Sequence, residues 1–437
     1  MKNRILSRFD YFLILIVLTL VTTGILFIYS SSINSEGISV TNEYIKQIIW
    51  ASAGIVCMVT ATLYDYRKLE SSSLWLYLGL ILLLVYTRIF GRYVNGAKSW
   101  IGIGEFGIQP SEFGKIFFIL FLARYLDRSQ NSDSQLRRFI AATAILLVPM
   151  GLILIQPDLG TASVYIPVFL LMCFIAGIPL RYIMYILLMG IMTIVFAIAP
   201  VWNTEIAKTP HAAISILTDM RLRMILVGAS AAISLIGFAV RRYFRGAGYW
   251  FWLTYIMSII TVSLVMSVVL GKVLKYYQIK RLIVFMDPQT DPLGSGWNII
   301  QSKIAIGAGG IFGRGYLNGT QSHYRFLPQQ STDFIFSILS EELGFAGGCM
   351  VFLLYFLIFT RILRIMKKTP NRYGLYILAG ILAMFSFHFF INVGMVMGMM
   401  PITGIPLLFL SYGGSSLLSA MTCVGLIMSI SSRRGLK

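Results

Sequence analysis

Long apolar runs separated by short polar segments dominate this chain of 437 residues. A hydrocarbon core about 30 Å thick needs roughly 20 apolar residues for one helix to cross it. Runs of this kind recur along the whole sequence and leave almost no room for a soluble domain. We therefore expect one integral membrane domain over 1–437, an all-α polytopic fold with about 12 transmembrane helices. The runs lie near 11–30, 47–63, 73–88, 112–126, 138–156, 160–178, 181–200, 223–240, 250–270, 336–360, 373–393 and 405–431.

Composition supports this interpretation, because 57% of the residues are hydrophobic and only 12% are charged. Soluble domains carry roughly twice that charged fraction. The four cysteines all fall inside apolar runs, so they indicate small buried side chains and not a disulfide framework. The three histidines, widely separated in the sequence, make no zinc site.

The formal net charge of +19 does not indicate nucleic-acid binding, because of where the basic residues lie. Lys and Arg concentrate in short loops on one side of the predicted spans, including Arg241 and Arg242 and both chain ends. Short basic loops mark the cytoplasmic side of a membrane protein. We therefore expect a multi-pass protein of the cytoplasmic (inner) membrane, with both termini cytoplasmic and the long 271–337 loop extracytoplasmic.

The 271–337 loop is the longest polar segment between apolar runs. It contains charged residues that anchoring in a membrane does not require, among them Lys303, Arg314 and Asp333. The WNIIQSKIAIG stretch (297–307) is too short to span and is expected to form a re-entrant or interfacial helix. This loop is therefore the first place to look for function.

Ionisable residues at or inside the membrane are candidates for function by default. Glu112 and Lys115 are three residues apart at a predicted helix start, so they face each other as a functional or a purely structural pair. Asp158 follows Pro157 and fits a turn and helix-cap residue better than a catalyst. Thr332 and Asp333 are both able to cap the next helix, which weakens the capping interpretation of Asp333.

Two further features have structural interpretations. Glu341 and Glu342 follow inside the next predicted span, and we expect them to bond to neighbouring helices. The glycine-rich run 307–315 lacks the G-x-G-x-x-G spacing and the strand–helix context of a dinucleotide-binding loop, so close backbone packing is expected.

Ordered motifs along most of the chain closely resemble those of the SEDS family (shape, elongation, division and sporulation), in particular its rod-elongation branch. The motifs are NGAKSW (95–100), QPSEFGKI (109–116), QPDLGTA (156–162), YQIKR (277–281), DPLGSGWNIIQSKIAIGAGGIFGRG (291–315), GTQS (319–322), LPQQSTDFIF (327–336), EELGFAG (341–347) and NVGMVMGMMPITGIPLLFLSYGGSS (392–416).

That resemblance implies a peptidoglycan glycosyltransferase that polymerises lipid II at the outer face of the membrane for cell elongation and shape. It implies as partners a class B penicillin-binding transpeptidase and other membrane proteins of an elongation complex. The family's essential acidic residue falls at Asp333, its loop tryptophan at Trp100, and its paired acidic and basic residues at Glu112 and Lys115.

The chain departs from the family pattern in two places. The family usually has Pro-Glu-x-His-Thr-Asp where this chain has Pro-Gln-Gln-Ser-Thr-Asp at 328–333, so neither the Glu nor the His is essential if the protein is active. The family plan has about ten spans, and this chain adds a two-helix insertion near 200–270. An even number of added helices leaves the catalytic loop on the same side.

The expected chemistry follows from the bond that is made. Converting an α-linked pyrophosphate into a β-1,4 bond requires inversion, and hence direct attack by the acceptor 4-hydroxyl with Asp333 as general base. The negative charge that develops on the leaving pyrophosphate must be stabilised by cations. The sequence does not decide whether a divalent ion, Mg²⁺ or Mn²⁺, is one of them. A precursor flippase and a non-catalytic scaffold are the alternatives. The expected supporting residues are Trp100, Glu112, Lys115, Asp158, Arg281, Lys303, Arg314 and Thr332.

Overall fold

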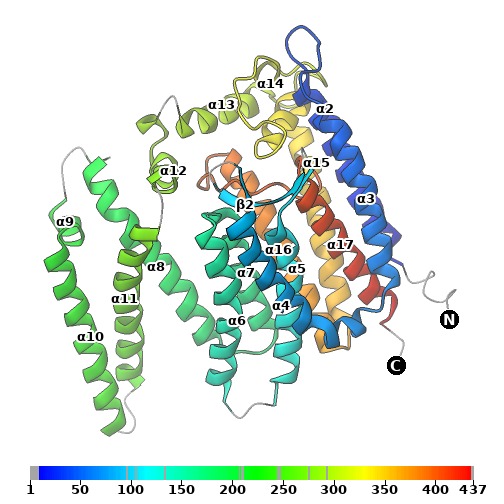
Figure 1. Ribbon diagram of the computed structural model, residues 1–437. Helices are drawn as coiled ribbons and strands as arrows, with labels where there is room; N and C mark the ends of the chain where they lie inside the picture. Colours follow the sequence, from blue (N-terminus) through cyan, green and yellow to red (C-terminus); the bar gives the residue numbers. More distant parts are fainter. Residues whose placement is uncertain are drawn as a thin grey trace. The chain divides into compact units, whose positions relative to one another are not determined.

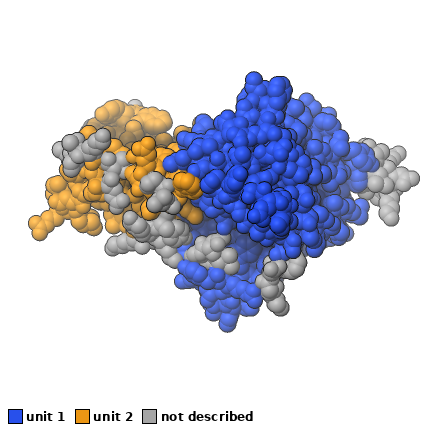
Figure 2. Space-filling model, turned by 90° about the horizontal axis from the view of Figure 1, so that it is seen from above, with its two compact units in different colours: residues 1–177, 298–437 blue, residues 178–297 orange. Residues whose placement is uncertain are grey.

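The computed structural model describes residues 9–94, 97–103, 106–131, 134–205, 207, 211–243, 248–273, 276–291 and 294–434. The chain divides into two compact units, coloured separately in Figure 2. The first comprises Met1–Gly177 and Asn298–Lys437, and the second comprises Ile178–Trp297. Among the predicted site residues only Arg281 belongs to the second unit.

Long apolar helices that lie side by side make up most of the first unit (Figure 1). Its centre is formed by α16 and α17, which are the most buried of the candidate spans. α17 packs against α3, and α16 packs against α7 and α5. The helices of this unit are α2 (Tyr11–Ser32), α3 (Glu43–Leu63), α4 (Tyr66–Phe90), α5 (Pro110–Arg128), α6 (Gln135–Ile155), α7 (Leu159–Ile175), α14 (Thr320–His323), α15 (Ile335–Lys367), α16 (Arg372–Val396) and α17 (Gly414–Ser432), with α13 (Ser295–Ala308) crossing the boundary between the units.

Every predicted apolar run overlaps a helix of the structure. Ten helices in the described part of the chain are long and apolar enough to cross a membrane. The two other predicted runs correspond to α5, which carries Glu112 and Lys115 among its 19 residues, and to α7, which has 17 residues. The prediction of an all-α polytopic membrane protein is confirmed.

A small antiparallel sheet between α4 and α5 was not predicted. Its strands are β1 (Arg92–Val94), β2 (Ala97–Ile103) and β3 (Phe106–Ile108), in the order β1-β2-β3. Strand pairing satisfies backbone groups that a loop beside the helices would otherwise leave to solvent. Trp100 on β2 packs over Gly107 on β3, where an added Cβ would lie 2.9 Å from the indole ring. A side chain at position 107 would clash with the indole ring, so the packing of Trp100 on the sheet requires glycine there.

The last apolar run becomes helical only at Gly414, so the predicted start of this span at 405 is corrected. Residues 401–413 are non-helical, and most of those from 405 onward are buried. Irregular backbone at such depth persists only where the protein satisfies its polar groups. Side chains supply these bonds: Asn392 Nδ2 to Ile405 O (2.8 Å), His388 Nδ1 to Pro406 O (3.0 Å), Ser411 Oγ from Leu407 N (2.9 Å), Gln47 Nε2 to Ser411 O (3.2 Å), and Tyr355 to Leu408 O.

In the second unit α10 packs against α11, and α11 packs against α8. Thr261 Oγ1 donates to Ser230 Oγ at 2.8 Å, and a Cβ on Gly237 would lie 2.6 Å from Thr254 Oγ1. Small residues of this kind let apolar helices approach closely. The predicted insertion at 200–270 contains α10 and α11, and its status as an insertion stays a prediction. The elements are α8 (Leu180–Glu205), α9 (Ala212–Thr218), α10 (Met220–Tyr243), α11 (Gly248–Val273), α12 (Tyr276–Met286) and the 3-10 turn η1 (Pro288–Thr290).

Candidate active site

The predicted Glu112–Lys115 pair forms on the buried face of α5. Lys115 Nζ lies 2.8 Å from both carboxylate oxygens of Glu112, and the two residues are only 2% and 5% exposed. Spacing of three residues places both side chains on one side of a helix. A charge so deeply buried is tolerated when it is paired and hydrogen-bonded.

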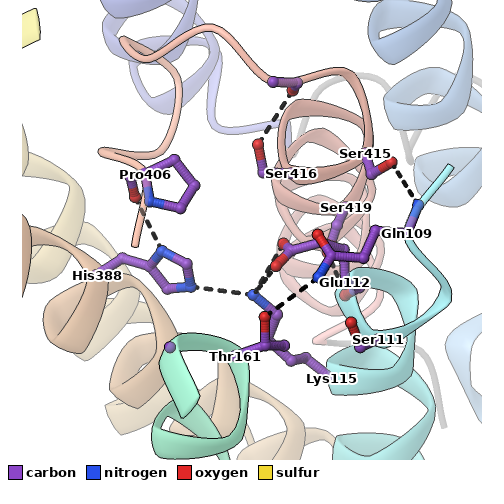
Figure 3. Close-up of polar contacts among 12 residues, drawn as sticks. Gln109, Ser111, Glu112, Lys115, Thr161, His388, Pro406, Ser415, Ser416 and Ser419 are labelled. Carbon is purple, nitrogen blue, oxygen red and sulfur yellow. Dashed lines mark hydrogen bonds and ion pairs between the residues drawn. The ribbon is translucent and has the colours of Figure 1, made fainter. Parts of the chain in front are cut away.

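His388 on α16 is a third member of this cluster, which was not predicted from the sequence (Figure 3). Its Nε2 lies 3.1 Å from Lys115 Nζ, and its Nδ1 lies 3.0 Å from the carbonyl oxygen of Pro406. A carbonyl can only accept, so Nδ1 carries the hydrogen and Nε2 accepts from the ammonium group. The only sequence signal was a histidine in an otherwise apolar span, with Asn392 one helical turn further on.

The start of α5 is bonded to α17 as well. The backbone N of Gln109 donates to Ser415 Oγ at 2.9 Å, and Ser419 Oγ donates to the carbonyl oxygen of Glu112 at 3.0 Å (Figure 3). The N–H of Gln109 lies at the start of α5, where backbone N–H groups have no partner within the helix, so Ser415 satisfies one of them. The Glu112–Lys115 pair thus lies where α5, α16 and α17 meet.

Asp158 is the N-cap of α7, as the sequence suggested. Its carboxylate accepts from Thr161 N at 3.0 Å and Thr161 Oγ1 at 2.8 Å. It also accepts from Gln109 Nε2 at 2.6 Å, which joins the start of α7 to the start of α5. Burial raises the pKa of Asp158 above its usual range, and the two bonds from Thr161 oppose that shift.

Asp333 lies in the turn immediately before α15, partly exposed to solvent. The N-cap of α15 is Phe334, so neither Thr332 nor Asp333 occupies the cap position. Thr332 Oγ1 donates within the turn to Gln329 O at 3.3 Å. The main chain of the turn is fixed from outside, because Asn392 Nδ2 donates to Asp333 O at 3.0 Å.

Further bonds fix the same turn to two other segments. Tyr412 N donates to the carbonyl oxygen of Ser331 at 2.8 Å. Gln330 Nε2 donates to Ser322 O, at the end of the first unit's short helix α14, at 3.1 Å. The turn that carries Asp333 is therefore bonded to three other segments of the first unit.

The glycine-rich run 307–315 packs against a break in α15. Gly344 has φ +67° and ψ −161°, so the helix is interrupted there and backbone groups on either side lose their usual partners. The glycine-rich run supplies replacements, which confirms the expected close backbone packing. The bonds are Arg314 N to Glu341 O (3.1 Å), Gly315 N to Glu342 O (2.9 Å), Phe345 N to Gly310 O (2.9 Å) and Ala346 N to Ile311 O (3.0 Å).

Glu341 and Glu342 bond to neighbouring segments, also as expected. Glu341 Oε1 accepts from Thr320 N at 2.8 Å and Gln321 N at 3.0 Å, at the start of α14. Glu342 accepts from Leu317 N at 3.0 Å and from the hydroxyl of Ser30 on α2. Both carboxylates therefore help to fix the loop before α15.

The predicted cationic residues differ in their settings. Lys303 and Arg314 are both exposed in the first unit. The Lys303 side chain lies against Gly398, and a Cβ added to that glycine would be 2.3 Å from the lysine Cε. Arg314 Nη1 donates to Thr320 Oγ1 at 2.9 Å. Arg281 lies on α12 of the second unit.

α13, which carries Lys303, is attached close to Asp333. Ser302 Oγ lies 2.8 Å from Ser337 Oγ, one turn after Asp333, and donates to Val396 O at 2.6 Å. The predicted short helix at 297–307 is thus confirmed, and it places Lys303 on the exposed side of this junction.

An apolar cavity of about 430 Å³ lies beside the sheet. Phe113 and Phe117 of α5 line it from a face of that helix other than the one carrying Lys115. Trp100 is not among its lining residues, although its neighbour Ile101 is. The other lining residues are Trp50, Leu83, Gly102, Ile108 and Pro110.

The structure therefore joins Glu112, Lys115 and Asp158 through bonded contacts, and it attaches the main chain of Asp333 to α16, which also carries His388. Among the described residues no group of three or more His, Cys, Asp or Glu side chains is placed to hold a metal ion.

The chain is similar to known proteins over its whole length. A family model described as cell cycle protein, FtsW/RodA/SpoVE, matches residues 11–207 and 205–435. Peptidoglycan glycosyltransferase RodA of Treponema pallidum is 54% identical over 437 residues, covering 99% of this chain and 100% of that protein. Peptidoglycan glycosyltransferase MrdB of Escherichia coli K12 is 32% identical, covering 97% and 94%.

Solved structures share the fold. A chain in a solved structure that describes the structural coordination of polymerization and crosslinking by a peptidoglycan synthase complex has a TM-score of 0.66 at 24% identity, covering 98% of this chain and 99% of that chain. The rod shape determining protein RodA of Thermus thermophilus has a TM-score of 0.61 at 21% identity, covering 98% of each chain.

Proposed function

The chain belongs to the FtsW/RodA/SpoVE family of cell cycle proteins and is a multi-pass membrane peptidoglycan glycosyltransferase of the RodA branch; from that premise we propose that it polymerises lipid II with Asp333 as the general base. The observation that carries this assignment is the placement of Asp333, a partly exposed carboxylate on a turn fixed by Asn392, Tyr412 and Gln330. We propose that the reaction takes place at the outer face of the cytoplasmic membrane.

The reaction is an inverting displacement in which the atoms balance without a covalent intermediate. The acceptor's 4-hydroxyl oxygen attacks the anomeric carbon of the donor sugar and gives its proton to Asp333. The bond from that carbon to the pyrophosphate oxygen breaks, and its electron pair leaves with the lipid pyrophosphate. The Asp333 carboxylate can accept this proton as a general base. General-base assistance contributes about 10²–10⁴ in rate.

Exposed cations of the first unit are suited to the leaving pyrophosphate. Lys303 and Arg314 are both exposed, and Lys303 lies on the helix bonded to Ser337 just after Asp333. Positive charge placed where negative charge develops lowers the barrier. Arg281 remains a candidate from the second unit. A divalent cation would be held mainly by the substrate's own phosphates, as is usual for Mg²⁺.

Lys115 has a different role, because its ammonium group is already bonded to Glu112 and His388. We propose that the Glu112–Lys115 pair and Asp158 support the site by fixing the starts of α5 and α7. Thr332 supports the Asp333 turn through its bond to Gln329.

The apolar cavity is suited to part of the substrate's isoprenoid chain. Its lining contains no charged residue, and it is bounded by the sheet that carries Trp100. Apolar pockets with a few polar groups nearby are the usual form of ligand sites. Trp100 is partly exposed on the same strand as the cavity-lining Ile101, and its amphipathic ring would contact the sugar–lipid junction.

A class B penicillin-binding transpeptidase is the proposed partner, since a protein of the same fold was solved in a peptidoglycan synthase complex. Glycan strands made by this chain would then be crosslinked by the partner as they emerge. Other elongation-complex proteins are proposed on the family resemblance.

A lipid-precursor flippase is the second candidate, and one observation favours it. α15 is broken at Gly344, and transporters bind substrate at broken helices. However, the backbone groups freed by that break are bonded to the glycine-rich run and not left to a substrate. Proteoliposomes with lipid II in one leaflet separate the candidates: a polymerase forms glycan strands, whereas a flippase exposes unpolymerised lipid II in the opposite leaflet. Strand formation without translocation supports our proposal, and translocation without strands contradicts it.

A further inference from the structure

Two polar side chains share one face of the apolar helix α16. His388 and Asn392 are four residues apart, 1% and 0% exposed, and therefore lie one above the other inside the first unit. A polar group buried among apolar side chains is unfavourable unless it is hydrogen-bonded. The hydrogen-bond partners of His388 and Asn392 should therefore indicate the role of these two side chains.

Both side chains bond to consecutive carbonyls of the same non-helical segment. Asn392 Nδ2 donates to Ile405 O at 2.8 Å, and His388 Nδ1 donates to Pro406 O at 3.0 Å. This face of α16 therefore holds the non-helical chain that leads into α17.

Each side chain also makes one contact to the candidate site. Asn392 Nδ2 donates to Asp333 O at 3.0 Å, and His388 Nε2 accepts from Lys115 Nζ at 3.1 Å. Both contacts of the Asn392 nitrogen are to carbonyl oxygens, which fixes the orientation of its amide. One rigid helical turn thus connects the turn of Asp333 with the buried cation of α5.

From this geometry we infer that His388 and Asn392 are positioning residues of the glycosyltransferase: Asn392 fixes the Asp333 turn, His388 fixes Lys115, and their shared segment 405–406 keeps the two in register. The inference rests on the proposed function, since it assumes that the Asp333 carboxylate is the base. Asn392 acts on the placement of Asp333, and His388 acts on Lys115 and so on the start of α5. A shift of about 1 Å in the placement of a reacting group can lower a rate about 10²-fold.

The His388 contacts can be separated by two substitutions of similar size. In His388→Asn the amide nitrogen takes the place of Nδ1 and keeps the bond to Pro406, but the acceptor for Lys115 is lost. In His388→Gln the amide reaches the place of Nε2 and can still accept from Lys115. We expect His388→Gln to retain at least about 10-fold more activity than His388→Asn. Equal activities, or the reverse order, would overturn the role assigned to His388.

Asn392 is tested by Asn392→Leu, which removes the donor, and by Asn392→Asp, whose buried carboxyl can donate to at most one of the two carbonyl oxygens. The full-length protein with its transpeptidase would be assayed for lipid II polymerisation, with kcat and KM measured separately and folding checked by thermal unfolding. We expect kcat to fall about 10²-fold with KM within a few-fold of wild type. Phe390→Leu, on the exposed face of the same helix, should leave both constants unchanged.

Two outcomes overturn the role of Asn392: wild-type kcat in both folded variants, or a raised KM with unchanged kcat, which indicates a binding role. Asp333→Asn in the same assay separates this inference from the proposed function. If Asp333→Asn is fully active, the base assignment fails. If it is inactive while the Asn392 variants are normal, only the positioning role fails. Should Asn392→Leu not fold, Asn392→Asp alone decides.

Discussion

Gly313 lies so close to the carbonyl oxygen of Glu342 that a Cβ on the glycine would be 2.1 Å from it. The glycine also has φ +80°, a conformation that other residues adopt with strain. This contact is the point where the glycine-rich run enters the break in α15. The loop that precedes Asp333 therefore depends on the absence of a side chain at this position.

We predict that Gly313→Ala destabilises the protein by at least about 1 kcal/mol and lowers activity, because the loop must move away from the helix break. Thermal unfolding in detergent and lipid II polymerisation measure the two effects. Gly307→Ala is the matched control, since nothing lies within 4 Å of its added Cβ. Equal melting temperatures for the two variants would show that the loop does not need this approach.

The buried Glu112–Lys115 pair gives a second prediction. Lys115→Met leaves a buried carboxylate without its partner and should cost about 3–5 kcal/mol, whereas the double variant Glu112→Gln with Lys115→Met should cost much less than the sum of the single variants. Unfolding of the four proteins forms a double-mutant cycle. Arg128→Ala, which breaks an ion pair whose arginine side chain is 59% exposed, should change little. Additive effects of the two buried substitutions would contradict direct coupling.

Asp158 tests a structural role against a catalytic one. Asp158→Asn keeps an acceptor for Thr161 N, and Asp158→Ala removes it, so we expect the alanine variant to lose about 1 kcal/mol more stability. Activity should follow stability in both. A loss of about 10³-fold in rate by well-folded Asp158→Asn would instead indicate a direct part in the chemistry.

The cavity beside the sheet gives a prediction about the lipid. Ile101→Trp would fill part of the 430 Å³, and we expect it to raise the KM for lipid II about 10-fold with little change in kcat. Lipid II with a shortened isoprenoid chain should be affected less, because it needs less of the cavity. An unchanged KM in a protein that melts like wild type would place the chain elsewhere.

Local patterns predicted much of this structure. Apolar runs located the helices, because each span must be long enough to cross the membrane. The spacing of Glu112 and Lys115 predicted their contact, because both lie on one helix. Asp158 was predicted to be a turn and cap residue because aspartate accepts hydrogen bonds from backbone amides a few positions away, and the structure shows that amide to be Thr161 N.

Features that depend on distant segments were not predictable in the same way. His388 and Lys115 are 273 positions apart in sequence and lie on different helices, yet their side chains are in contact. No local sequence pattern predicts such a contact. The segment 405–413 is apolar enough to resemble a span, yet bonds from Gln47, Tyr355, His388 and Asn392 make its non-helical path stable. The sheet of β1, β2 and β3 depends on pairing between short strands whose hydrophobic pattern is weak.

The most direct test of the account is lipid II polymerisation by the purified protein with its transpeptidase, comparing wild type, Asp333→Asn and Asp333→Glu. We predict glycan strands from wild type, a loss of about 10²–10⁴-fold in rate for Asp333→Asn, and partial activity for Asp333→Glu, which keeps a carboxylate at a shifted position. Wild-type rates from folded Asp333→Asn would contradict the assignment of Asp333 as the base.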